Sequence, residues 1–295
     1  MEFGRVAPEE LDNIDFHLPP DGAITGLVLP GERVQTPKVY LGCAKWGRPE
    51  WVGRLYPPKT RPRDFLKHYV HVYNSIELNL THYKIYGASA TAKWAATAVD
   101  SDFLFCPKMF EGVTHHGKLR NNRFMLNEFL RGIRGFGDHL GPVLVQFSDK
   151  FSPKRFDELI TFLSPVCSEF PVVLELRHRD WFRKAEISEQ LTKELAVLGA
   201  GFVITDAAGR RDCLHMNLST PEAFVRFVGN SLHPTDFTRI DEWVMRINSW
   251  LQRGLRRVFF FIHMHDEALS PELALYAAKQ LNNVCGTTLP LPPLY

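Results

Sequence analysis

Eight short apolar segments alternate with segments of helical character along most of this 295-residue chain. The apolar segments are rich in Val, Ile, Leu and Phe and are bounded by turn residues, a pattern typical of strands buried on both faces. They lie at residues 38–43, 75–79, 103–108, 142–147, 172–177, 201–206, 223–228 and 258–263. Helices are expected between them at residues 62–71, 89–98, 121–135, 153–163, 187–198, 238–251 and 270–281.

This alternation predicts an α/β protein with parallel strands, because a strand, a helix and the next strand form one crossover unit. Eight such units within about 250 residues favour a closed (β/α)8 TIM barrel over an open, doubly wound sheet. Residues 207–221 lack a helical pattern, so one helix is expected to be missing between the sixth and seventh strands. No Gly-x-Gly-x-x-Gly motif follows a strand, and a dinucleotide-binding fold therefore has no sequence support.

A single barrel domain is expected to occupy residues 38–283. Residues 1–37 are rich in Pro, Gly and acidic residues without periodicity, which predicts an irregular N-terminal extension. Residues 284–295 end in Pro-Leu-Pro-Pro-Leu-Tyr, which predicts an extended C-terminal tail.

The composition gives no reason to expect an unusual partner. A formal net charge of +2 indicates a nearly balanced surface, so nucleic acid is not an expected partner. The five cysteines lie far apart without a Cys-x-x-Cys pair, which argues against a zinc ribbon or a disulfide framework. No apolar run approaches the roughly 18 residues of a membrane span. We therefore expect a cytoplasmic protein with no membrane partner and no cofactor.

Polar side chains stand at the carboxyl ends of nearly all the predicted strands. In a TIM barrel the loops after these ends form the active face. Because side chains alternate between the two faces of a strand, nearly every strand is expected to point a polar residue inward. These residues are Glu77, Asn79, Lys108, Gln146, Glu175, Arg177, Asp206, Arg226, His263 and His265.

Buried charges stabilise a fold little more than apolar packing does, so this collection favours a site, with a structural ion network as the alternative. We expect Glu77 and Glu175 to be a catalytic acid and base whose pKa values are pushed apart by their surroundings. Lys108 and Arg177 are expected to be catalytic residues that hold developing negative charge. A Schiff base between Lys108 and a carbonyl substrate is a further alternative.

Residues around this set are expected to bind the substrate. Arginine suits phosphate or carboxylate, amide side chains orient polar groups, and aromatic rings after strands one and five can stack on a sugar or base. The expected substrate-binding residues are Asn79, Gln146, His178, Trp181, Trp46, Asp206 and Arg226. For the two tryptophans, packing within the loops is the favoured interpretation and ligand stacking is the alternative.

The histidines give a weaker signal. His263 and His265 share a strand face and would be the ligands if a divalent metal were bound, but hydrogen-bonded histidines are the favoured interpretation. Five others, His68, His71, His82, His115 and His116, fit no ligand pattern and are expected at the surface.

Several segments together resemble the YecE-like proteins, the family catalogued as domain of unknown function 72. They include Leu-Gly-Cys-Ala-Lys-Trp-Gly at residues 41–47 and Leu-Glu-Leu-Arg-His-Arg-Asp-Trp at residues 174–181, with further pieces at 51–57, 73–83, 93–94, 103–108 and 140–147. The resemblance implies a TIM-barrel fold and no established reaction. It places characteristic polar positions of the family on Glu77, Asn79, Lys108, Gln146, Glu175, Arg177, His178 and Trp181.

The expected function is an enzyme that acts on a small polar or anionic ligand, such as a sugar or sugar phosphate, by acid–base chemistry at the mouth of the barrel. The residues do not distinguish an isomerase from a lyase or a hydrolase. Two alternatives stay open: a metal-dependent phosphoester hydrolase acting on nucleic acid, and a non-catalytic ligand-binding barrel.

Overall fold

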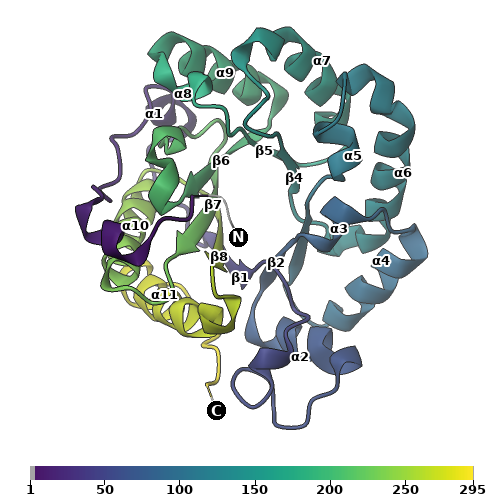
Figure 1. The fold of residues 1–295 in the computed structure, drawn as a ribbon, viewed down its shortest axis with the longest axis vertical. Coiled ribbons are helices and arrows are strands. Elements are labelled where there is room, and N and C mark those ends of the chain that lie inside the picture. The colour runs from purple at the N-terminus through teal and green to yellow at the C-terminus, as the bar shows by residue number, and fades with distance from the viewer. Residues whose placement is uncertain (1–3, 295) are drawn as a thin grey trace.

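The computed structural model describes residues 4–294 and contains eight parallel strands, one at each predicted position (Figure 1). The prediction of their number and place is confirmed. The strands are β1 (Lys38–Cys43), β2 (Ser75–Leu78), β3 (Leu104–Pro107), β4 (Val143–Gln146), β5 (Val172–Glu175), β6 (Gly201–Asp206), β7 (Glu222–Gly229) and β8 (Arg257–Met264).

The prediction of a closed (β/α)8 barrel is wrong. Six strands form one parallel sheet, a half-barrel in the order β1-β8-β7-β6-β5-β4, and β2 and β3 form a separate two-stranded sheet. The strands still follow one another around a common interior, but the backbone ladder is interrupted between β1 and β2 and between β3 and β4. Strand patterns in a sequence do not reveal such interruptions, because they depend on contacts between distant segments.

Side chains occupy the gap between β1 and β2. The Asn74 side chain accepts a hydrogen bond from the backbone N–H of Leu41 (2.7 Å) and donates one to the carbonyl of Val39 (2.8 Å). The hydroxyl of Tyr69 accepts from the N–H of Cys43 (2.7 Å). Buried backbone groups require partners, and here two side chains satisfy groups that a neighbouring strand would otherwise bind.

Between β3 and β4, two backbone hydrogen bonds cross the gap among the described residues. The N–H of Gly141 donates to the carbonyl of Phe105 (2.8 Å), and the N–H of Met109 donates to the carbonyl of Leu144 (2.9 Å). Pro107 lies between these two contacts along β3 and has no N–H to donate. The proline therefore prevents a continuous ladder at this position.

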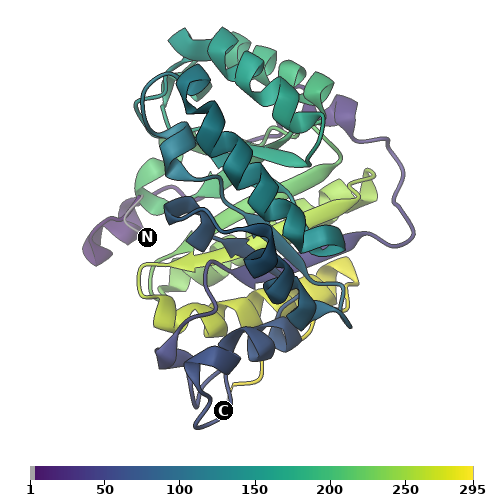
Figure 2. The ribbon, with the colours of Figure 1, turned by 90° about the vertical axis from the view of Figure 1, so that its right-hand side faces the viewer.

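Helices surround the strands on the outside (Figures 1 and 2). The longer ones are α2 (Phe65–Val72), α4 (Ala88–Ala95), α6 (Arg123–Ile133), α7 (Phe156–Cys167), α9 (Ala185–Leu198), α10 (Pro234–Gln252) and α11 (Ser270–Cys285). Short ones are α1 (Thr25–Val28), α3 (Leu80–Tyr83), α5 (Glu111–Thr114) and α8 (Asp180–Arg183). Between β6 and β7 the chain forms only the 3-10 helix η8 (Ala208–Cys213), where the sequence predicts a missing helix.

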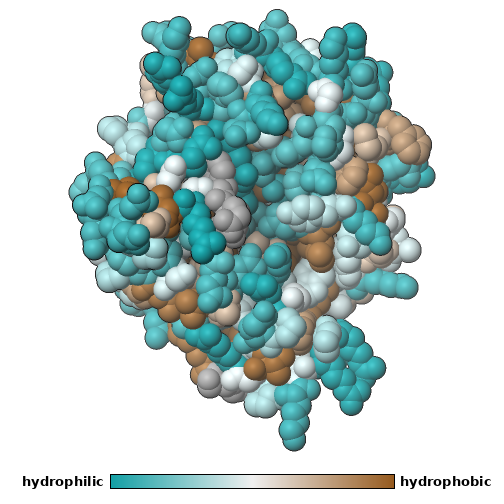
Figure 3. All heavy atoms as spheres, in the orientation of Figure 1, coloured by the Kyte–Doolittle hydropathy of each residue, from teal (hydrophilic) through white to brown (hydrophobic). Residues whose placement is uncertain are grey.

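No helix among residues 4–294 is long and apolar enough to cross a membrane. Hydrophilic side chains predominate on the face drawn in Figure 3, and hydrophobic residues form small patches between them.

The predicted N-terminal extension contains the 3-10 helix η1 (Pro8–Asn13) and α1, and it is anchored to α10. Asp21 forms ion pairs with Arg246 (2.9 Å) and Arg253 (2.6 Å). The carbonyl of Gly4 accepts a hydrogen bond from Gly209 in η8 (2.8 Å), so the extension also reaches the loop after β6. Residues 1–3 of the extension and residue 295 of the tail lie outside the described residues.

The strands enclose a small apolar cluster that is separate from the large core between strands and helices. Its side chains alternate with those that face the helices, as the pleat of a strand requires. The members are Tyr40, Leu104, Cys106, Leu144, Val173, Val203, Phe224, Phe259 and Phe261, and we call them the interior cluster. It forms an apolar floor under the carboxyl ends of the strands, which we call the mouth.

The seam between β1 and β2 leads to a first prediction. Replacing Asn74 by Ala removes two hydrogen bonds and leaves backbone groups of Leu41 and Val39 without these partners, so we expect a loss of about 2–4 kcal/mol of unfolding free energy. Urea denaturation followed by far-ultraviolet circular dichroism measures it. Asn282→Ala, which also removes a side chain bonded to the backbone but lies in α11 near the tail, is the matched control and should cost less. Equal losses would contradict a special role for the seam.

Candidate functional site

Seven buried polar residues lie above the interior cluster, one from the carboxyl end of each strand except β1. All but Glu77 lie two positions after a member of the interior cluster, and alternation therefore turns them inward. Glu77 follows Ser75, whose hydroxyl lies 3.6 Å from the thiol of Cys106. The seven are Glu77, Lys108, Gln146, Glu175, Thr205, Arg226 and His263, and we call them the mouth cluster.

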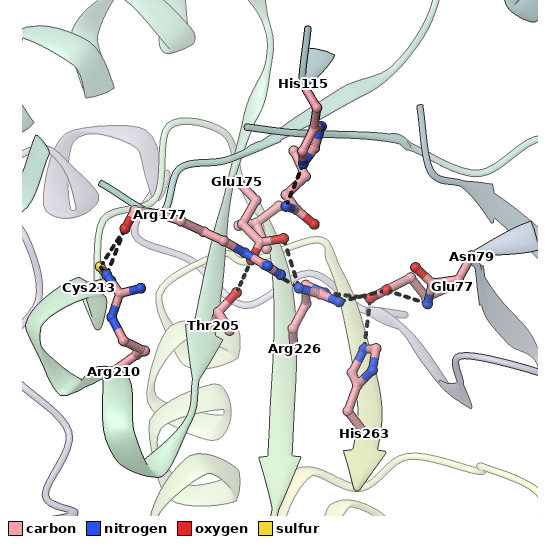
Figure 4. A network of polar contacts seen from close by, with 12 residues as sticks. Glu77, Asn79, His115, Glu175, Arg177, Thr205, Arg210, Cys213, Arg226 and His263 are labelled. Atoms are coloured by element: carbon pink, nitrogen blue, oxygen red, sulfur yellow. Dashed lines mark hydrogen bonds and ion pairs between the residues drawn. The ribbon is translucent and has the colours of Figure 1, made fainter. Parts of the chain in front are cut away.

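Arg226 of β7 is the centre of the mouth cluster (Figure 4). Its guanidinium binds the Glu77 carboxylate through Nε (2.7 Å) and Nη2 (2.9 Å). Its Nη1 binds both oxygens of Glu175, at 2.9 and 2.8 Å. The planar fork of donors suits carboxylates on two sides, and Arg226 thereby connects β2 of the small sheet with β5 of the half-barrel.

Other side chains also form hydrogen bonds to the two carboxylates. Glu175 accepts from Arg177 Nε (3.0 Å) and from the Thr205 hydroxyl (3.1 Å). Glu77 accepts from the Asn79 amide (3.0 Å) and lies 3.0 Å from Nε2 of His263. Burial lowers the pKa of His263 against the opposing effect of Glu77, so this histidine is a neutral hydrogen-bond donor near neutral pH.

These contacts keep both carboxylates ionised. Burial by itself raises the pKa of Glu77, but Arg226 and His263 together outweigh it and hold the pKa well below its usual range. Burial also raises the pKa of Glu175, and Arg177 and Arg226 outweigh it and lower that pKa to about 2. Both groups are therefore carboxylates at neutral pH, and their pKa values are not pushed apart in the way that an acid and a base require.

Lys108 differs from the rest of the mouth cluster. Its side chain is buried, yet its Nζ forms no hydrogen bond or ion pair with any residue between 4 and 294. Burial and the positive charge of Arg226 lower the pKa of Lys108 to about 7, although Glu175 acts in the opposite direction. A buried amine that exchanges its proton near neutral pH is a frequent property of functional sites.

Gln146 carries a second unused polar atom. Its Oε1 is buried and has no hydrogen-bond partner among the described residues, while its Nε2 lies 3.5 Å from Nε2 of His115. Lys108 forms an isolated backbone bridge to Leu144, two residues before Gln146, so these two side chains come from neighbouring positions of β3 and β4. The buried layer thus holds a donor and an acceptor whose hydrogen-bonding capacity is not used by the described residues.

Two histidines expected at the surface line the mouth instead. His82 is buried, with Nδ1 2.7 Å from the carbonyl of Met109, and its ring packs edge-on against His115 at 5.1 Å. Burial and Lys108 lower the pKa of His82 to about 3 and that of His115 to about 4, so both imidazoles are neutral near neutral pH. His82 lies in α3 and His115 at the end of α5, the short helices that follow β2 and β3, and this placement is the signal that sequence reasoning missed. It also missed Thr205, which shares its strand with Asp206.

Asp206 points away from the mouth cluster. Its carboxylate accepts from Trp243 (2.8 Å) and forms ion pairs with Arg239 (2.9 Å) and Arg211, on the side of β6 that faces α10. Strand alternation explains this, because Thr205 occupies the inward position. The structure thus places Asp206 in a separate buried ion network.

Three other predicted substrate-binding residues lie outside the network of Arg226. Trp181 is fully buried, stacks on Phe151 and donates to its carbonyl (2.7 Å), which is loop packing. His178 is half-buried and accepts from the N–H of Asp180 (3.2 Å). Trp46 is half-buried after β1, with its ring edge-on to Trp94 at 5.4 Å.

His263 and His265, the two predicted metal ligands, have no third ligand beside them among the described residues. His263 is hydrogen-bonded to Glu77, and His265, two residues further along the chain, is half-buried. Within the described part of the chain, no three His, Cys, Asp or Glu side chains are grouped so that they could hold a metal ion.

A prediction concerns the central arginine. Arg226→Met leaves two buried carboxylates without their main partner, and we expect a loss of about 3–5 kcal/mol of stability at pH 8. In the wild type, the low pKa values of the carboxylates give stability that is lost only as pH falls below about 4. In the variant those pKa values rise, so its stability should increase as pH falls from 8 to 5 while the wild type changes little.

Urea denaturation at both pH values measures the effect of Arg226→Met. Arg256→Met is the control, because Arg256 is exposed and its loss should change stability by less than about 0.5 kcal/mol. A deficit of Arg226→Met that deepens on acidification would contradict the proposed role of the arginine.

Lys108 generates a prediction of opposite sign. In the folded chain its pKa is about 7, whereas in the unfolded chain it is about 10.4, so the unfolded state binds the proton first as pH falls. The energetic cost of Lys108 thus grows between pH 10 and pH 7 and is constant below. Lys108→Met should therefore be more stable than the wild type, with a gain on the order of a few kcal/mol larger at pH 7 than at pH 10.

Thermal and urea unfolding between pH 6 and 10 tests this expectation. Lys193→Met, at an exposed position of α9, should show no pH-dependent difference from the wild type. If Lys108→Met were instead destabilised at every pH, Lys108 would be part of a structural ion network.

Comparison with known proteins identifies relatives along most of the chain. The sequence model of the family described as "Protein of unknown function DUF72" matches residues 40–293. The UPF0759 protein YecE of Escherichia coli (strain K12) is 27% identical over 253 residues, covering 80% of this chain and 89% of YecE. The UPF0759 protein YunF of Bacillus subtilis (strain 168) is 28% identical over 153 residues, covering 49% of this chain and 52% of YunF.

Two solved structures have a similar fold. A DUF72 family protein from Enterococcus faecalis V583 matches with a TM-score of 0.68 and 17% identity, covering 86% of this chain and all of the other. A DUF72 family protein from Thermotoga maritima MSB8 matches with a TM-score of 0.64 and 22% identity, covering 83% and 99%. The match over residues 40–293 shows that the chain belongs to the YecE-like DUF72 family, whose function is unknown.

Proposed function

We propose that this protein is an enzyme that acts on a small anionic substrate at the mouth by acid–base chemistry, with Lys108 as the group that accepts and returns a proton. The main support is the buried Lys108 amine, which has no hydrogen-bond or ion-pair partner among residues 4–294. The carboxylates and guanidiniums next to it are paired with one another. Fold stability gives no reason to retain such a group.

The charges around Lys108 support an anionic ligand. Glu77 and Glu175 carry two negative charges, and Arg226 and Arg177 carry two positive charges, so these four cancel. A proton on Lys108 adds one positive charge that nothing in this group balances. A phosphate or carboxylate near Nζ would raise the pKa of Lys108 and favour its protonated form.

Neighbouring residues suit the binding of such a substrate. The Arg177 side chain is 16% exposed, whereas that of Arg226 is fully buried, so Arg177 is the guanidinium of the network that a ligand can reach. The unused Oε1 of Gln146 can accept a hydrogen bond from a substrate hydroxyl. The half-buried ring of Trp46 at the rim suits a sugar, which favours a sugar or sugar phosphate within this class.

An amine with a pKa near the working pH is an effective general base, because it is partly unprotonated and still basic enough to take a proton. Glu77 and Glu175 remain as ionised groups that hold Arg226 and Arg177 in place. In this arrangement the carboxylates position the cations, and Lys108 transfers the proton.

The proposal is tested by ligand screening followed by turnover. In a thermal-shift screen of phosphorylated and carboxylated sugars, at least one compound should raise the melting temperature of the wild type. Its affinity should fall about tenfold in Arg177→Met, because one charge-assisted contact is lost, and remain unchanged in Arg256→Met.

Each compound that binds is then followed by nuclear magnetic resonance for conversion. Conversion by the wild type should fall about 10²–10⁴-fold in Lys108→Met. Binding without conversion would indicate a non-catalytic ligand-binding protein, and conversion that persists in Lys108→Met would remove Lys108 from the mechanism.

A further inference from the structure

We propose that Lys108 acts as a nucleophile and forms a covalent imine with the carbonyl carbon of a small anionic aldehyde or ketone. This inference rests on the proposed function, because it uses the same mouth, and it specifies the substrate class as an anionic carbonyl compound.

The backbone of Lys108 is held firmly while its amine is left without a partner. Its N–H donates to the carbonyl of Leu78 (3.3 Å), and its carbonyl accepts from the hydroxyl of Thr81 (2.8 Å). These contacts attach the end of β3 to β2 and α3. The interior cluster members Leu104 and Cys106 precede it on the same strand face. The side chain therefore starts from a firmly held backbone above the apolar interior cluster. Its Nζ forms no hydrogen bond or ion pair with any of residues 4–294.

The groups that face Lys108 disfavour its ammonium form. Arg226 of β7 and Arg177 of β5 repel a positive charge, and burial acts in the same direction. Glu175 and Glu77 attract it, but their oxygens already accept from other donors, the two arginines among them.

The remaining neighbours that Lys108 affects are His82 and His115, and both are neutral near neutral pH. Lys108 can therefore present the nitrogen lone pair that attack on a carbonyl requires, whereas an exposed lysine is almost fully protonated at the same pH.

The reaction balances without an oxidant or a cofactor. The Nζ lone pair forms a C–N bond, the C=O π electrons move to oxygen, and transfer of one N–H proton to that oxygen gives a carbinolamine. The carbon–oxygen bond then breaks, and the oxygen leaves as water with the proton it already carries and the second N–H proton. The nitrogen lone pair closes the C=N bond, so an amine and a carbonyl give an imine and water.

Gln146 and Arg177 suit the two ends of such a substrate. The unused Oε1 of Gln146 can accept a hydrogen bond from the carbinolamine hydroxyl, which satisfies a buried acceptor. Arg177 can hold the phosphate or carboxylate. A protonated imine carries one positive charge, which the four paired side chains do not balance. The anionic group of the substrate would stabilise this charge.

Reductive trapping tests the imine. The full chain is incubated separately with pyruvate, glyoxylate and dihydroxyacetone phosphate in the presence of sodium cyanoborohydride, and modified peptides are mapped by mass spectrometry. We expect at least one probe to modify Lys108 at least tenfold faster than any exposed lysine. The Lys108 adduct should disappear in Lys108→Met and Lys108→Arg and persist in Lys193→Met.

The pH profile of trapping supplies an independent readout. Modification of Lys108 should level off above about pH 7, because the amine is then unprotonated. Modification of an exposed lysine should keep rising by about tenfold per pH unit up to pH 9, because its pKa is near 10.4. A Lys108 profile that follows the exposed lysines would overturn the inference.

The same probes are also tested by thermal shift, so that the two proposals fail separately. Probes that stabilise the wild type without modifying Lys108 would overturn the imine and leave the acid–base function standing. Absence of selective Lys108 modification with all three probes overturns the imine whether or not they bind. Selective modification that matches the predicted pH profile supports it.

Discussion

The buried guanidinium of Arg226 is the interaction on which the interior of this protein depends. It binds Glu77 from the two-stranded sheet and Glu175 from the half-barrel, so it connects the two sheets across the interior, where their backbone ladders do not meet. Without it, Glu77 would lose its cationic partner and Glu175 one of its two, and both carboxylates are buried, which is strongly unfavourable. The same two carboxylates also accept hydrogen bonds from Arg177, Thr205, Asn79 and His263.

The pairing of Arg226 also determines which group of the mouth is reactive. Because it holds both carboxylates in their ionised form, neither is suited to exchange a proton near neutral pH. Lys108 remains outside the pairs, buried and close to its midpoint of protonation. The paired charges therefore determine the electrostatic environment of the Lys108 amine. The acid–base and imine proposals both follow from this one uncompensated group.

Strand alternation predicted which of these side chains point inward, but it did not predict which groups they bind. It indicated that Glu77, Glu175, Arg177 and Arg226 point toward a shared interior, and the structure brings them together. Asp206 is the exception, because the inward residue of β6 is Thr205 and the choice between adjacent polar residues requires the true register. His82 and His115 escaped notice because α3 and α5 are too short to carry a periodicity from which the direction of a side chain can be derived.

By itself the sequence determined the eight strands, most helices and the inward polar layer, because these follow from local periodicity and alternation of side chains. Only the tertiary structure decided where the ladder is interrupted, since Asn74 and Tyr69 take over backbone contacts at one seam and Pro107 prevents them at the other. It also decided that Arg226 binds Glu77, 149 residues away, and that Lys108 is left without a charged partner among the described residues. Such pairings depend on distances between remote segments, which only the folded chain defines.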